Sequence, residues 1–88
     1  MDEKIQKVLE EKIHESTSKG NEITLLVKSL GHVENPNGFE RGLIIGRLYN
    51  SFHYQSRRIL KRSPTDQEFS EFVELLKEHT NELEDYFS

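Results

Sequence analysis

The side chains best suited to chemistry or binding are concentrated in residues 47–58, whose sequence is RLYNSFHYQSRR. Arginine forms forked hydrogen bonds with carboxylates and phosphates, and neighbouring amide and aromatic side chains add contacts to proteins or bases. Nucleophilic catalysis has little support, because the chain contains no cysteine and no serine in a Gly-x-Ser-x-Gly elbow. The segment therefore predicts a binding surface for an anionic partner.

Helical geometry divides this segment into two sides. At about 100° per residue, a helix over 39–62 turns Leu48, Tyr49, Phe52 and Ser56 inward, with His53 on the border. The outward residues form what we call the basic face: Arg47, Asn50, Tyr54, Arg57, Arg58 and Lys61.

A protein partner is the interpretation we prefer for the basic face. Residues 39–62 contain one acid and six bases, a net charge of +5, whereas residues 63–88 contain eight acids and one base, a net charge of −7. Affinity for nucleic acid arises largely from counterion release, which an acidic neighbouring segment opposes. Nucleic-acid binding through the basic half of the 39–62 helix is the alternative. A weaker one is an enzyme or anionic-ligand site formed by Tyr49, His53 and Arg57, for which the sequence supplies no group that would orient the histidine.

A structural interpretation of the basic residues competes with all of these. The turn at 63–65 brings the end of the 39–62 helix close to the acids that begin the next helix. Bases at a helix C-terminus and acids at a helix N-terminus also complement the two helix dipoles. We therefore expect part of the positive charge at 58–62 to pair with Asp66, Glu68 and Glu71.

The last helix carries a stripe of acids on its outer side: Glu71, Glu74, Glu78, Glu82 and Asp85. Of these, Glu74, Glu78 and Glu82 form what we call the acidic face. Like charges four residues apart destabilise a helix by a few tenths of a kcal/mol each. This cost indicates that solvation, the basic surface of a partner or a second copy of the chain offsets the repulsion. We expect the acidic face to be a second protein-binding surface.

Metal binding is not expected. Glu11 and His14 have the Glu-x-x-His spacing used in diiron bundles, but such sites need a second copy of the motif and two further inward glutamates. Both residues lie opposite the apolar stripe of their own helix. We expect neither a metal nor another cofactor.

Four apolar patterns with helical spacing place these residues on elements. The pattern of the first helix includes Ile5, Leu9 and Ile13, and that of the last includes Phe69 and Phe72 on its inner side. Helices are predicted over 2–18, 22–30, 39–62 and from the Thr65/Glu68 capping box to about residue 86, with turn chemistry over 32–38. The stripe Ile23, Leu26, Val27 and Leu30 favours a short buried helix, although a strand is the alternative for so short an apolar run. The predicted fold is all-α, a single domain over 1–88 built as a small helical bundle of three long helices plus one short helix, with helix 39–62 central.

Composition limits the remaining choices. With 88 residues of which 33% are apolar, the chain has a small core, and self-association as a homodimer is one way to bury more surface. No apolar run approaches the roughly 20 residues that cross a bilayer, so we expect no membrane partner. The charged N-terminal segment and the absence of cysteine favour a cytoplasmic protein.

Overall fold

A computed structural model describes residues 1–18, 21–31 and 34–79 of the chain, and within them every regular element is helical. The elements are α1 (Glu3–Ser18), α2 (Asn21–Leu30), α3 (Pro36–Gln55), the π-helical turn η1 (Ser56–Leu60) and α4 (Asp66–Glu78). The helices pack against one another, so the predicted all-α fold, a small helical bundle with the third helix central, is confirmed.

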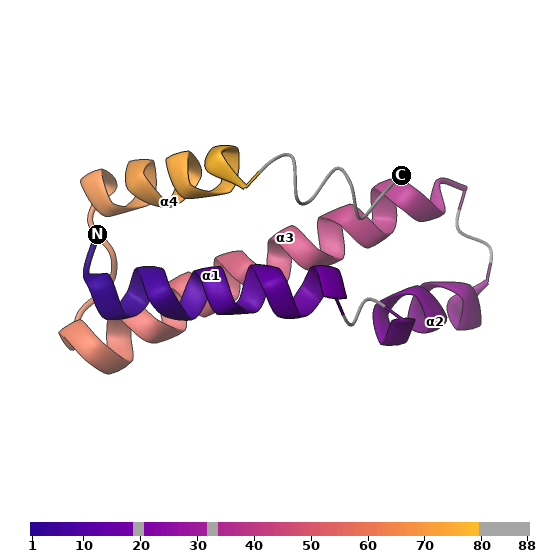
Figure 1. Cartoon of the computed structure of the whole chain (residues 1–88), viewed down its shortest axis with the longest axis horizontal. Helices are drawn as coiled ribbons and strands as arrows, with labels where there is room; N and C mark the ends of the chain where they lie inside the picture. Colours follow the sequence, from indigo (N-terminus) through magenta and orange to yellow (C-terminus); the bar gives the residue numbers. More distant parts are fainter. Residues whose placement is uncertain (19–20, 32–33, 80–88) are drawn as a thin grey trace.

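Helix α3 is the central helix, and the other helices pack against it (Figure 1). Helices α1 and α2 both pack along it. Helix α3 runs in the opposite direction to α1, and α4 returns along the same end of the molecule, parallel to α1 (Figure 1). The α2 end of α3 is therefore covered less than the end where α1 and α4 lie.

The hydrophobic core joins one face each of α1, α3 and α4, together with Ile23 of α2. At its centre the rings of Phe52 and Phe72 stack with centroids 4.6 Å apart and an interplanar angle of 7°. The other buried hydrophobic residues of this cluster are Ile5, Leu9, Ile13, Ile23, Ile44, Leu48 and Leu75. The predicted α1 stripe and the inward positions of Leu48, Phe52 and Ser56 are confirmed. Tyr49 was predicted to be inward as well, and this is wrong: it is 47% exposed, with its ring tilted at 45° to the Phe72 ring and the centroids 6.3 Å apart.

The ambiguous segment 22–30 is a helix, which settles the choice against a strand. Its burial is less complete than predicted: Ile23 and Val27 are buried, but Leu26 is 48% exposed and Leu30 57% exposed. The physical reason is that α2 has α3 as its principal neighbour, which covers only half of the stripe. The Thr24 hydroxyl donates a 2.5 Å hydrogen bond to the buried Glu40 carboxylate and fixes α2 on α3.

Both ends of α3 differ from the predicted bounds of 39–62. The helix begins three residues earlier, because the Asn35 side chain caps it by accepting a 3.0 Å hydrogen bond from the Gly38 amide, with Pro36 in the first turn. At the other end the α-helix gives way to η1, where the buried Ser56 hydroxyl donates to the Phe52 carbonyl oxygen at 2.8 Å. Lys61 then stops the chain in the left-handed conformation, with φ 62°.

The start of α4 follows the predicted capping box. The Thr65 hydroxyl accepts from the Glu68 amide at 3.2 Å, and the Glu68 carboxylate accepts from the Thr65 amide at 2.9 Å. Phe72 lies in the core as predicted, but Phe69, predicted on the same inner stripe, is about half exposed. The predicted continuation of this helix beyond residue 79 lies outside the described residues.

Candidate functional site

Helix α3 and the turn η1 present the basic face to solvent. All six of its residues are exposed, and Tyr54 exposes 54% of its surface between the arginines. The opposite side of the same helix carries Leu48 and Phe52, so burial of the core fixes which way the arginines point. Arg47 and Arg57 are ten residues apart, about 15 Å along the helix axis. The face is therefore an elongated strip with its basic residues near both ends.

Pairing with α4 neutralises only one of the bases near the turn. Arg62 forms a forked contact with Glu68, with Nη1 to Oε1 at 2.6 Å and Nη2 to Oε2 at 3.3 Å. In the part of the chain that the structure describes, Arg47, Arg57 and Lys61 form no ion pair or hydrogen bond through their side chains. The expectation that acids of α4 would pair with this charge is met for Arg62, whereas Arg47, Arg57 and Lys61 of the basic face have no acidic partner among residues 1–18, 21–31 and 34–79.

The Arg62–Glu68 pair also changes the acid–base behaviour of the turn. The hydrogen bond from Arg62, assisted by the Thr65 amide, lowers the pKa of the Glu68 carboxyl to about 2. The same hydrogen bond raises the pKa of the Arg62 guanidinium. Glu68 thus remains ionised through mildly acidic conditions and holds the α3–α4 turn closed.

Gln55 is a buried residue that contacts one arginine of the basic face. The sequence pattern places it beside the arginines, whereas the structure buries it. Its side-chain oxygen accepts a 3.2 Å hydrogen bond from Arg58 Nε, which restrains the direction of that guanidinium. A buried amide next to exposed arginines is hard to recognise in sequence, because glutamine is common on both sides of a surface helix.

The acidic face is described only in part. Glu74 and Glu78 are exposed on α4, and Glu74 contacts Lys77 Nζ at 3.3 Å within the helix. Glu82 lies outside the described residues. Glu71, which the wheel places on the outer stripe, is half buried and pairs with the Met1 α-amino group. The acidic stripe therefore loses one member to a contact between α4 and the start of the chain.

The residues of the weaker alternative site are arranged as an aromatic edge contact. The Tyr49 and His53 rings lie 4.7 Å apart at 76°, and His53 also packs against Phe52 at 5.5 Å. Arg57 follows one turn later and is exposed. His53 lines neither the hollow between α1 and α4 nor the hollow between α2 and α3. This geometry fits a boundary histidine whose ring packs on its neighbours.

The histidines of α1 and α4 meet near the ends of those helices. His79 Nε2 lies 3.6 Å from a Glu10 carboxylate oxygen, and the His79 and His14 rings make an edge contact at 6.2 Å. Glu11, the other residue of the Glu-x-x-His spacing, is exposed. Among the described residues, no three histidine, aspartate or glutamate side chains converge to hold a metal ion.

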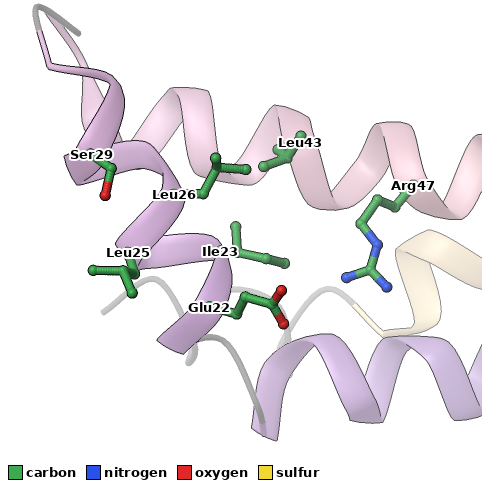
Figure 2. A pocket seen from close by; sticks show the side chains of 7 residues that line it. All are labelled: Glu22, Ile23, Leu25, Leu26, Ser29, Leu43 and Arg47. Carbon is green, nitrogen blue, oxygen red and sulfur yellow. The ribbon is translucent and has the colours of Figure 1, made fainter.

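Hollows in the described surface include two that are lined in part by charged residues. One lies between α1 and α4, has a volume of about 300 Å³ and is lined mainly by polar side chains, including Gln6 and Glu74. The other, which we call the α2–α3 groove, has a volume of about 520 Å³ and is lined by Glu22, Ile23, Leu25, Leu26, Leu43 and Arg47 (Figure 2). Sequence reasoning missed this groove, although Leu25 was a signal: it is an apolar residue outside the predicted α2 stripe.

No protein-family model, no curated protein and no solved structure matches this chain, so a functional interpretation rests on its own surfaces. None of the helices in the described ranges is long and apolar enough to cross a membrane. The class that the fold defines is a small all-α helical bundle with a basic strip along its central helix.

Proposed function

We propose that this chain is a non-enzymatic interaction module, present in the cytoplasm, that binds an acidic surface of a protein partner through the basic face and also self-associates. The observation that carries the proposal is that Arg47, Arg57 and Lys61 are exposed and make no ion pair with the described residues. Exposed arginines next to a half-exposed tyrosine have the composition that is enriched at protein interfaces.

The acidic face extends the proposal to a partner with mixed charge. Glu78 is exposed on α4 and belongs to a different helix from the basic face. Opposite charges on separate helices favour a partner with a matching charge pattern, which mainly increases the association rate and the specificity. The net charge of −4 disfavours a long polyanion such as nucleic acid as the partner.

The proposal is tested by binding of a glutamate-rich peptide and of duplex DNA, measured separately by fluorescence anisotropy at several salt concentrations. The double variant Arg57→Glu, Arg58→Glu is compared with Lys4→Glu, Lys7→Glu, which changes the charge equally on exposed positions of α1. We expect wild-type protein to bind the peptide at low salt, the first variant to lose about tenfold or more in affinity, and the second to bind nearly as wild type.

Two outcomes would contradict the proposal. Binding to DNA that exceeds binding to the peptide and depends on Arg57 and Arg58 would favour the nucleic-acid function. Equal effects of the two double variants would show that total charge, rather than the basic face, determines binding.

A further inference from the structure

The α2–α3 groove collects exposed apolar surface at one end of the molecule. Seven large hydrophobic side chains are exposed among the described residues, and Leu25, Leu26, Leu30 and Phe39 belong to α2 or the first turn of α3. Leu25 exposes 64% of its surface, the largest fraction among them. Two of them, Leu25 and Leu26, line the groove itself together with the charged Glu22 and Arg47. Exposed apolar surface rimmed by charge is typical of an interaction site.

The walls of the groove are formed by α2 and α3, and their apolar side chains differ in exposure. Leu26 of α2 points toward Leu43 of α3, with Ile23 between them at the floor (Figure 2). Leu25 points away from α3, toward the open side (Figure 2). The floor is thus formed by Ile23 and Leu43, which are packed in or against the hydrophobic core, whereas Leu25 and Leu26 on the rim are exposed.

Opposite charges stand on the two walls. Glu22 lies at the start of α2 and Arg47 in the middle of α3, and their charged groups point toward each other across the groove (Figure 2). No ion pair joins them, and neither side chain pairs with another of the described residues. One acid and one base, separated by an apolar floor, therefore remain available.

We propose that the α2–α3 groove is the surface through which a second copy of this chain binds, in a two-fold arrangement that places Glu22 of each copy against Arg47 of the other. This inference rests on the self-association in the proposed function and names its surface. A two-fold interface joins the same patch on both subunits, so it must be complementary to itself. Walls of opposite charge on either side of exposed leucines meet that requirement.

A second copy fits these features better than a partner of one charge sign. An acidic ligand would be attracted by Arg47 but repelled by Glu22. A basic ligand would be attracted by Glu22 but repelled by Arg47. The two-fold arrangement satisfies both side chains twice and covers Leu25 and Leu26 with the same residues of the other copy. Because the groove is about 15 Å from Arg57 along the α3 axis, the partner-binding end of the basic face stays open in the dimer.

The interface is tested by charge exchange between copies. Sedimentation velocity over a broad concentration range is measured for the wild-type chain and for the single variants Glu22→Arg, Arg47→Glu and Leu26→Glu. An equimolar mixture of the two charge-reversal variants and the double variant Glu22→Arg, Arg47→Glu are measured in the same way. Lys7→Glu and Glu3→Arg are matched controls at exposed positions of α1. Far-UV circular dichroism and thermal melting of every variant establish that the bundle is folded.

We expect wild-type protein to form a dimer, and each charge-reversal variant alone to weaken it by about tenfold or more. Leu26→Glu is expected to weaken it at least as much, and the α1 controls to leave it unchanged. Mixing Glu22→Arg with Arg47→Glu is expected to restore dimers, because each cross-copy contact then joins opposite charges again.

Three results would overturn the inference, and they separate it from the rest of the proposed function. A dimer that none of the groove variants affects would leave self-association intact and remove the groove as its surface. Restoration in the double variant Glu22→Arg, Arg47→Glu but not in the mixture would place the pair within one copy. A wild-type chain that is monomeric at every concentration would remove self-association itself, whereas peptide binding by Arg57 and Arg58 would still be measured independently.

Discussion

Helices α1 and α2 have similar apolar stripes, but the two stripes are buried to different extents. In α1 the stripe of Ile5, Leu9 and Ile13 is fully buried, whereas in α2 only half of the stripe is buried and Leu26 and Leu30 face solvent. The difference lies in the neighbours: α1 packs along α3 and contacts α4 through His79, while α2 has α3 as its main support. An amphipathic pattern thus predicts which side of a helix is buried. How much of that side is buried depends on how many other helices pack against it.

The two ends of the molecule also differ in what their side chains contribute: those at one end are packed in the core, and those at the other line an open groove. The α1, α3 and α4 end contains the stacked Phe52 and Phe72 rings and the side chains with almost no exposed surface. The α2 end contains an open groove of about 520 Å³. We infer that the first region supplies most of the free energy of unfolding, and that the second supplies surface whose burial requires another molecule.

The largest expected effect is the difference in free energy of unfolding between the same leucine-to-alanine substitution in the α1 stripe and in the α2 stripe. Leu9→Ala removes a side chain that is 0% exposed and is expected to lower the free energy of unfolding by about 2–5 kcal/mol. Leu26→Ala, measured at a protein concentration where the chain is monomeric, is expected to cost about 1 kcal/mol or less, since the residue is 48% exposed. Urea denaturation followed by circular dichroism measures both. Similar costs for the two variants would show that the α2 stripe is as well buried as the α1 stripe.

A smaller effect concerns the turn that closes the packed end. The pKa of Glu68 is about 2 in the folded chain and about 4.3 in an unfolded one, so its pairing with Arg62 is fully effective above the unfolded value. The stabilisation is lost as the pH falls from about 4 toward 2. The loss is expected to be small because solvent screens this surface pair.

Comparison of Glu68→Gln with wild type isolates this contribution, because glutamine retains the capping-box geometry and cannot ionise. The difference in melting temperature between the two proteins should shrink as the pH is lowered through that range. Glu78→Gln, at an exposed position of α4, is the matched control and should show no such convergence. A constant difference between Glu68→Gln and wild type at all pH values would contradict the assignment.

Local signals in the sequence were sufficient for much of the fold. The 3.6-residue spacing of Ile5, Leu9 and Ile13 predicted α1 and its buried side, and the capping box of Thr65 with Glu68 predicted the start of α4. These features depend on contacts within one helix or on a stripe that is covered completely. The earlier start of α3 had a signal as well, because Asn35 before Pro36 is a helix cap followed by a favourable first-turn residue.

The remaining differences are tertiary in origin. Tyr49 and Phe69 lie near the inward side of their helices, but the periodicity contains no information on where the neighbouring helix ends, and both are about half exposed. Glu71 is drawn into a contact with the Met1 amine, which no pattern within α4 indicates. The basic face could be predicted because its six residues follow the exposed side of one helix, whereas the groove requires the placement of α2 on α3.

Hydrogen exchange of the wild-type chain, followed by mass spectrometry at low and high protein concentration, tests the contrast between the two regions most directly. We predict that amide protection in α2 and the first half of α3 increases with concentration, because a second copy covers the α2–α3 groove, while protection in α1 and α4 stays the same. Protection that is independent of concentration in α2, or that rises equally in α1 and α4, would contradict the account.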